Sequence, residues 1–150
     1  MALKILDHGS PEYLQMVKLR NEILRKPLGL VLNEEELLQE KNQILIGAFE
    51  DDVMLGCCMV VKESEQECRL RQMAVLNTLR GKGVGRAIMT FAENIARDRG
   101  YKRMVMHARS TALGFYEKLG YKTCGEEFIE ITIPHYIMQK ELTSREDLSF

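Results

Sequence analysis

Residues 80–86 read RGKGVGR and alternate glycine with cationic and apolar residues. They follow a strand-like run, LRQMAVL, and precede an amphipathic run, AIMTFAENIARDRG, so a helix is expected to begin there. The first backbone N–H groups of a helix have no intrahelical acceptor, and the helix dipole adds to their attraction for anions. Glycines let a ligand approach these groups, so the segment predicts a diphosphate site. The glycines and cations concerned are Gly81, Gly83, Gly85, Arg80, Lys82 and Arg86.

The spacing of the glycines separates several kinds of phosphate-binding loop. A Walker A loop needs Gly-Lys followed by Ser or Thr, whereas Lys82 is followed by Gly83. A dinucleotide fingerprint needs Gly-x-Gly-x-x-Gly, whereas this segment reads Gly-x-Gly-x-Gly and lies in mid-chain. The segment does contain Arg-x-x-Gly-x-Gly, from Arg80 to Gly85. A glycine-rich turn packed under a helix is the purely structural alternative.

The Arg-x-x-Gly-x-Gly pattern resembles the coenzyme A pyrophosphate loop of the GNAT acetyltransferase superfamily. Two further stretches carry the same resemblance, in the family's order. LRQMAVL (70–76) is similar to the central strand, where a bulge opens the sheet for the pantetheine arm, and ALGFYEKLGY (112–121) is similar to the second signature. The ending, FIEITIPHYIMQKEL, resembles a small, single-domain bacterial branch of the superfamily. The resemblance covers residues 3–142 and is strongest over 69–121.

This resemblance implies transfer of the acetyl group of acetyl-CoA to an amine of a small molecule or peptide by direct attack. The backbone of Met73, Ala74 and Val75 would pair with the pantetheine amides, and the Val75 N–H would polarise the thioester carbonyl. The glycine segment would hold the pyrophosphate. The residues that the resemblance assigns to cofactor binding are Met73, Ala74, Val75, Arg80, Gly81, Lys82, Gly83, Val84, Gly85, Arg86, Phe115 and Tyr116.

The chemistry also requires two proton transfers, one from the amine and one to the departing thiolate. The resemblance favours Tyr116 as proton donor, because an ordinary tyrosine pKa of ~10 keeps its hydroxyl protonated at neutral pH. A core position is the alternative for Tyr116. Many relatives carry a glutamate base on the central strand, but residues 69–72 contain no carboxylate. The candidate bases are His107, and His135 with Glu130, each with a structural role or a water-mediated path as the alternative.

The missing glutamate supports a rival from a different functional class, an acyl-CoA-binding sensor or regulatory module without turnover. A nucleotide-phosphate protein is a third interpretation of the glycine segment. The acceptor itself has no signal in the sequence.

The composition limits the classes of partner and the compartment. At 150 residues the chain fits one domain, and its formal net charge of −1 argues against nucleic-acid binding as the main task. The start of the chain does not resemble a signal peptide, and no apolar run approaches the ~18 residues needed to span a bilayer. The four cysteines lack Cys-x-x-Cys spacing and are expected to be apolar core residues in the cytoplasm. No metal and no membrane are expected, and the resemblance allows a homodimer.

Strands and helices must position these residues. Helices are expected from Pro11 to about Arg25 with Ser10 as its cap, from Asn33, from Val84 to Gly100, and from Thr111 to Lys118 with Ser110 or Thr111 as its cap. Strands are expected at 3–6, 43–49, 53–62, 67–76, 104–108, 121–128 and 135–142, with IEITIP (129–134) linking the last two.

This order of elements predicts an α+β fold. The resemblance specifies a GNAT-like mixed, mostly antiparallel central sheet of six to seven strands flanked by about four helices. The domain is expected to occupy residues 1–142, with 143–150 as a loose tail. Arg20 and Arg25, on the first helix, are expected on a solvated face.

Overall fold

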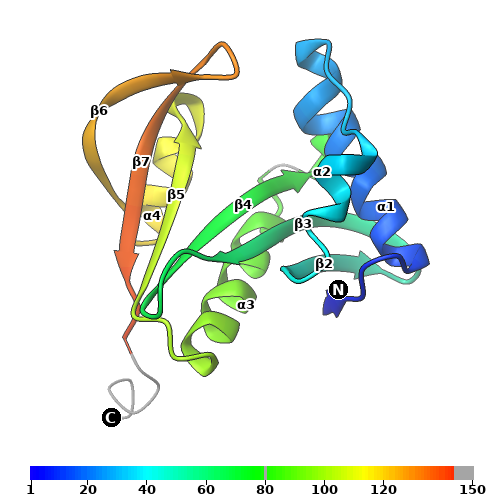
Figure 1. Cartoon of the computed structure of the whole chain (residues 1–150), viewed down its shortest axis with the longest axis horizontal. Helices are drawn as coiled ribbons and strands as arrows, with labels where there is room; N and C mark the ends of the chain where they lie inside the picture. Colours follow the sequence, from blue (N-terminus) through cyan, green and yellow to red (C-terminus); the bar gives the residue numbers. More distant parts are fainter. Residues whose placement is uncertain (80, 144–150) are drawn as a thin grey trace. The chain divides into compact units, whose positions relative to one another are not determined.

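The computed structural model describes residues 1–79 and 81–143, so Arg80 and most of the predicted tail lie outside the described residues. The described part contains seven strands and four α-helices, which confirms the predicted α+β fold (Figure 1). In chain order the elements are β1 (Ala2–Leu6), α1 (Pro11–Arg20), the π-helical turn η1 (Asn21–Arg25), the 3-10 turn η2 (Lys26–Leu28), α2 (Glu34–Leu38), β2 (Ile44–Glu50), β3 (Val53–Lys62), β4 (Glu67–Val75), the 3-10 turn η3 (Asn77–Leu79), α3 (Val84–Asp98), β5 (Arg103–Arg109), the 3-10 turn η4 (Ser110–Ala112), α4 (Leu113–Lys118), β6 (Lys122–Glu130) and β7 (Ile133–Glu141).

The strands form one mixed sheet in the order β1-β2-β3-β4-β5-β7-β6. Strands β4 and β5 are parallel and pair from Glu67↔Arg103 to Arg69↔Val105. The pairs β1–β2, β2–β3, β5–β7 and β6–β7 are antiparallel. The predicted mostly antiparallel sheet of six to seven strands is therefore confirmed.

The chain divides into two compact units, and each is built from two separate stretches. Unit 1 comprises Met1–Val61 and Gln72–Ala92, and unit 2 comprises Lys62–Arg71 and the chain from Glu93 onward. Strand β4 and helix α3 each contribute residues to both units.

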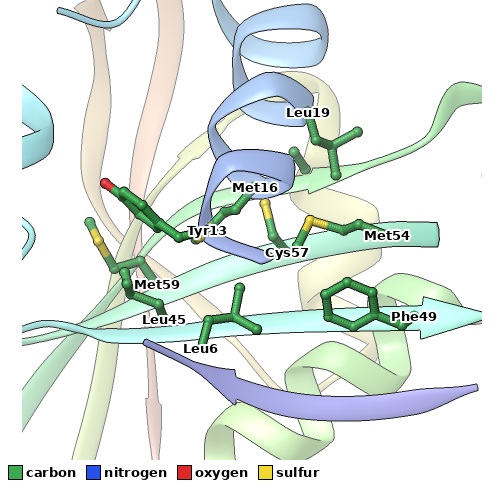
Figure 2. Close-up of a cluster of buried hydrophobic side chains, with 10 residues drawn as sticks. Leu6, Tyr13, Met16, Leu19, Leu45, Phe49, Met54, Cys57 and Met59 are labelled. Atoms are coloured by element: carbon green, nitrogen blue, oxygen red, sulfur yellow. The ribbon is translucent and has the colours of Figure 1, made fainter. Parts of the chain in front are cut away.

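In unit 1, helix α1 covers one face of β2 and β3 (Figure 2). The helix begins as predicted, because Ser10 Oγ accepts a hydrogen bond from the Tyr13 N–H and Pro11 occupies the first turn. The opposite face of β3 carries Gly56, where a Cβ would lie 2.8 Å from Ile88 Cδ1 of α3. Glycine at this position therefore lets α3 pack closely on the strand. The buried side chains of this core come from α1 and from the strands that it covers. They are Leu6, Tyr13, Met16, Leu19, Leu45, Phe49, Met54, Cys57, Met59 and Ala74.

The first helix changes its pitch before its predicted end. Helix α1 ends at Arg20, and the π-helical turn η1 and the 3-10 turn η2 follow it. Pro27 lacks an N–H, and in a regular α-helix its ring would clash with the carbonyl of Ile23. The Asn21 side chain instead accepts a hydrogen bond from the Leu32 N–H, which fixes the chain after the turn. The expected α-helix to Arg25 is therefore five residues too long.

The prediction that Arg20 lies on a solvated face is wrong. The Arg20 side chain is 0% exposed, and two of its guanidinium nitrogens donate to the Glu40 carboxylate at 2.7 and 2.6 Å. The Tyr13 hydroxyl donates to the same carboxylate at 2.8 Å. We call Tyr13, Arg20 and Glu40 the Arg20 cluster. Its bidentate geometry offsets part of the cost of burying two charges and ties α1 to the segment before β2.

Unit 2 is held together by buried apolar residues and by one buried carboxylate. Tyr121, at the start of β6, donates its hydroxyl hydrogen to Glu93 of α3 at 2.8 Å, and Lys140 of β7 donates to the same carboxylate at 2.9 Å. Glu93 is 6% exposed, so these bonds compensate a charge that has left water. The buried apolar residues on alternate positions of β5 and β7 are Met104, Met106, Ala108 and Met138.

The link between the last two strands is shorter than predicted. Strands β6 and β7 are joined by Ile131 and Thr132 alone, not by the six residues IEITIP. Both linking residues have positive φ, 51° and 62°. Hairpin loops of two residues favour this conformation, but the usual sequences are Asn-Gly or Asp-Gly, and β-branched residues are strained there.

The cap predicted for the short helix after β5 is also wrong. No side chain caps α4 at Ala112. The Ser110 hydroxyl donates instead to the Glu127 carboxylate of β6 at 2.9 Å.

The cysteines are free thiols, and Cys57, Cys58 and Cys68 are buried, as expected of core residues. Burial raises the pKa of the Cys57 and Cys68 thiols to about 12, so both are protonated at neutral pH. No helix in the described residues is both long enough and apolar enough to cross a bilayer.

Candidate active site

The glycine segment of unit 1 forms a turn that leads into α3. Gly81 and Gly83 have φ of 79° and 83°, a conformation that favours glycine. Among the residues that the structure describes, a Cβ at either position would meet nothing within 4 Å, so the space above this backbone is open there. The structural alternative, in which the glycines pack tightly under the helix, does not describe these two positions.

The amides that follow this turn are available to an anion. Helix α3 begins at Val84, and the first intrahelical bond runs from the Ala87 N–H to the Gly83 carbonyl at 3.0 Å. The N–H groups of Val84, Gly85 and Arg86 lie in the first turn and have no intrahelical acceptor. Lys82 and Arg86 are exposed beside them, and Arg80 lies outside the described residues. Open backbone, first-turn amides and mobile cations together fit a diphosphate group.

Strand β4 is interrupted just before the residues assigned to pantetheine. Gln72 has φ of 58°, which is rare for a residue other than glycine and typical of a bulge. Beyond it, the Leu76 N–H donates to the Leu55 carbonyl of β3 at 3.0 Å. Because N–H directions alternate along a strand, the N–H of Val75 points away from β3. Met73 and Val75 are half-buried, and Ala74 is buried. The Val75 amide is thus oriented to pair with a group other than β3.

Tyr116 lies on α4 in unit 2 and is 6% exposed. Its ring makes edge contacts with Phe115 at 4.9 Å and with Tyr121 at 5.9 Å between centroids. Its carbonyl accepts hydrogen bonds from the N–H groups of Leu119 and Tyr121. Phe115 is 38% exposed. These contacts fix the ring of Tyr116, a property that both a core residue and a positioned proton donor require.

The three other candidate catalytic residues come together in unit 2. His107 Nδ1 lies 3.0 Å from Glu130 Oε1, and His135 Nε2 lies 3.8 Å from Glu130 Oε2. The Phe128 ring lies against both imidazoles. A fourth side chain joins them, because an Arg69 guanidinium nitrogen lies 3.1 Å from His107 Nδ1. We call Arg69, His107, Glu130 and His135 the Arg69 cluster.

The charges of the cluster keep Glu130 ionised. Burial acts to raise the pKa of Glu130, but the hydrogen bond and charge of His107, with the charges of His135 and Arg69, hold it below its usual value. Glu130 is therefore a carboxylate at neutral pH and can only accept hydrogen bonds.

The two imidazoles differ in what they can offer. His135 Nδ1 lies 2.7 Å from the Ile133 carbonyl, which can only accept, so this nitrogen carries a proton. The side chain of His135 is 7% exposed, whereas that of His107 is 28% exposed. When His107 Nδ1 donates to Glu130, its Nε2 carries the lone pair. His107 is thus the more accessible proton acceptor.

Sequence reasoning found His107, Glu130 and His135 but did not assign a role to Arg69. Its only signal was indirect, since it occupies the stretch of the central strand where many relatives have a glutamate. No group of three or more histidine, cysteine, aspartate or glutamate side chains in the described residues could hold a metal ion.

Comparison with known proteins gives consistent results. Residues 26–142 match the family model described as an acetyltransferase (GNAT) domain. The chain is 32% identical over 125 residues to the uncharacterized N-acetyltransferase YjcF of Bacillus subtilis, covering 81% of this chain and 87% of YjcF. It is 33% identical over 112 residues to the uncharacterized protein YyaT of the same organism, covering 74% of each chain.

Among solved structures, an aminoglycoside 6'-N-acetyltransferase complexed with coenzyme A superposes with a TM-score of 0.82. The superposition covers 97% of this chain and 99% of that chain. The sequence identity is 18%, so this likeness shows the fold alone.

Proposed function

Since the chain belongs to the GNAT acetyltransferase family, we propose that it transfers the acetyl group of acetyl-CoA to an amine of a small molecule or peptide by direct attack. The match of residues 26–142 to the family carries this proposal. Acetyl-CoA supplies an activated acyl group as its thioester, and the residues of the chain must bind it, orient it and move two protons.

Binding is assigned to the backbone of unit 1. The N–H groups of Gly81 and of residues 83–86 would hold the pyrophosphate, with the side chains of Lys82 and Arg86 adding charge. The Lys82 N–H itself donates to the Leu79 carbonyl. The open space above Gly81 and Gly83 supports this assignment. The Val75 N–H, directed away from β3, would donate to the thioester oxygen and polarise the carbonyl. The backbone of Met73, which points the same way as that of Val75, would pair with pantetheine, and Ala74, Arg80 and Phe115 complete the assigned set.

His107 is assigned as the general base. Glu130 accepts a hydrogen bond from the Nδ1–H of His107, which leaves the lone pair of Nε2 to take a proton from the attacking amine. The Glu130 carboxylate then stabilises the imidazolium that forms. A lysine-like amine with pKa ~10.4 costs about 4.6 kcal/mol to deprotonate at pH 7, so a base matters most for such acceptors. His135, whose side chain is more deeply buried, is assigned a structural role beside the other oxygen of Glu130, 3.8 Å from its Nε2.

Tyr116 is assigned as the general acid. As the C–N bond to the acceptor forms and the C–S bond breaks, its hydroxyl donates a proton to the sulfur. The ring contacts with Phe115 and Tyr121 support this role, because they hold the ring in one orientation.

The proposal includes three properties of the whole protein. The domain spans residues 1–142, the protein resides in the cytoplasm, and it forms a homodimer. Cell fractionation and size-exclusion chromatography with light scattering would test the last two.

Two measurements test the function. Thiol release from acetyl-CoA, followed over a panel of amines, should reveal turnover, and calorimetry should detect coenzyme A binding. Tight binding without turnover on any amine would favour the acyl-CoA sensor instead. Gly83→Asp should abolish binding, because it combines a strained backbone with a like charge, and normal binding by this variant would contradict the assigned cradle.

A second variant tests the acid. Tyr116→Phe should lower kcat about 100-fold while the affinity for coenzyme A stays within about twofold. Unchanged turnover would remove Tyr116 from this role.

A further inference from the structure

Arg69 has more hydrogen-bond donors than the protein satisfies. A guanidinium carries five N–H groups. Within residues 1–79 and 81–143, its one contact at hydrogen-bonding distance is to His107 Nδ1, at 3.1 Å. Its Nε is buried and has no hydrogen-bond partner there. No ion pair within the same residues joins a carboxylate to Arg69, so a partly buried cation lacks a matching anion.

The contact between Arg69 and His107 involves a ring nitrogen that Glu130 also approaches. His107 Nδ1 lies 3.1 Å from the guanidinium and 3.0 Å from Glu130 Oε1. One ring nitrogen holds either a proton or a lone pair. When Nδ1 carries a proton, it donates to Glu130, and its N–H faces the Arg69 N–H unfavourably. When Nδ1 carries a lone pair, it accepts from Arg69, and the lone pair faces the Glu130 oxygen unfavourably. The cluster is therefore short of one acceptor, and the shortage falls on Arg69.

The other groups of the cluster do not fill this place. Glu130 is already used by His107 and approached by His135. The His135 Nδ1 proton is taken by the Ile133 carbonyl. An acceptor for Arg69 must then come from outside the chain, at the point where the proposed base lies.

We propose that the acceptor amine carries a carboxylate, which binds Arg69 while the amine faces His107. This inference rests on the proposed function and names its class of substrate. The carboxylate takes the Arg69 N–H groups, as a planar fork suits a planar anion. His107 Nδ1–H then donates to Glu130 without opposition, and Nε2 is left as the proton acceptor. Carboxylate binding thus selects the tautomer of His107 that acts as the base.

The geometry limits the acceptor further. Because Arg69 contacts the imidazole that would take the proton, the carboxylate and the amine must be separated by a short spacer, as in an α-amino acid. A polycation such as an aminoglycoside would bring more positive charge to an arginine that forms no ion pair with a carboxylate in the described part of the chain. The likeness to an aminoglycoside acetyltransferase extends to the fold alone, and we expect the acceptor to differ.

The test compares acceptors that differ only in the carboxylate. Amino acids, their amides and the corresponding decarboxylated amines are assayed in parallel, with phosphoethanolamine as an anion of a different shape. The expected result is a kcat/KM at least 10-fold higher for the amino acid than for its amide, about the value of one charge-assisted pair. Equal or better use of the amides, of an aminoglycoside or of phosphoethanolamine would overturn the proposal.

Arg69→Gln provides the matching variant. It should bring the ratio of kcat/KM for the acid and the amide close to one. Arg103→Gln is the control, because Arg103 lies on β5 and pairs with Glu67 and Glu141 at the surface. Its ratio should equal that of the wild-type protein. A ratio that survives in Arg69→Gln would overturn the proposal.

A spectroscopic arm separates this inference from the proposed function. In ¹⁵N-histidine-labelled protein, adding an N-acetyl amino acid should move the imidazole shifts of His107 toward the tautomer protonated at Nδ1, and the amide of that product should not. Turnover without a carboxylate preference would leave the function intact and overturn the inference. The expected shift without any turnover would support the carboxylate site and contradict the function. No shift at saturating ligand would overturn the inference.

Discussion

The Arg20 cluster of unit 1 and the Arg69 cluster of unit 2 each contain an arginine and a glutamate, yet their geometry differs. Arg20 is 0% exposed and bonds both oxygens of Glu40, and Tyr13 completes the set. Arg69 is half-buried, and its one hydrogen-bonding contact is a nitrogen that Glu130 also approaches. Both arginines have a buried Nε without a partner in the described residues, so that feature does not separate them.

The difference shows how a structural charge pair can be told from a site. An arginine that is enclosed and matched by a carboxylate is not accessible to a ligand, and its removal should affect stability. An arginine that is accessible and incompletely matched can receive an anion, and its removal should affect ligand selection. Residue type and burial class give only part of this distinction, because the pairing geometry decides it.

The largest expected effect is a loss of stability, and it tests the structural role of the Arg20 cluster. Arg20→Ala leaves the Glu40 carboxylate buried without its counter-charge, and it should lower the free energy of unfolding by about 3–5 kcal/mol. Urea denaturation measures this loss. Arg103→Ala, which removes two exposed ion pairs, is the control and should cost below about 1 kcal/mol. Similar losses for the two variants would contradict the assignment.

The next effect concerns the other cluster. His107→Gln should lower kcat about 100-fold, the typical contribution of a general base. The free energy of unfolding should change by less than about 1 kcal/mol, because the side chain is 28% exposed. Steady-state kinetics and urea denaturation on the same preparation give both values. A stability loss of the size expected for Arg20→Ala would instead make the second cluster structural.

A combined variant sharpens the comparison. Replacing the Arg20 cluster by apolar residues, as Tyr13→Phe with Arg20→Met and Glu40→Leu, should recover stability to within about 2 kcal/mol of the wild-type protein. The reason is that no buried charge is left unpaired. Activity should be retained, since none of the three residues has an assigned catalytic role. A loss as large as that of Arg20→Ala alone would show that the ion pair cannot be replaced by packing.

The smallest effect is a dependence of stability on pH. The folded-state pKa of Glu130 is lowered, so its ionised form contributes stability that is present above the ordinary glutamate pKa. This contribution disappears as pH falls through the lowered pKa. Glu130→Gln should therefore be less stable than the wild-type protein at pH 7, by below about 1 kcal/mol since the carboxylate is partly solvated. Urea denaturation measures the free energy of unfolding of both proteins. The same difference between them at pH 7 and at pH 3 would contradict the contribution of ionised Glu130 to stability.

Local signals in the sequence predicted much of the fold. Ser10 and Pro11 predicted the start of α1, and the apolar repeat after Val84, ended by Gly100, predicted α3 to within two residues. The strands predicted at 43–49 and 53–62 also match β2 and β3, and Asp51, in the turn between them, has φ of 53°. These features depend on neighbouring residues, which a sequence displays directly.

The errors arose where distant residues decide the conformation. Ile131 and Thr132 are not typical turn residues, so the sequence did not indicate a hairpin there. The pairing of β6 with β7 imposes positive φ on these two residues, although β-branched side chains disfavour it. Arg20 was misplaced because its partner, Glu40, is twenty residues away. The convergence of His107 with Glu130 depends on a register shift in β6 between Cys124 and Phe128. Spacing in the sequence contains none of these pairings.

The division of the chain into two interleaved units has a practical consequence. The backbone passes from one unit to the other after Val61, after Arg71 and after Ala92. No single cut releases either unit whole, so a deletion that removes one unit cannot leave the other intact. Recombination between relatives at one crossover point would likewise join halves of different units. In chimeras with relatives, the two units should therefore be exchanged together.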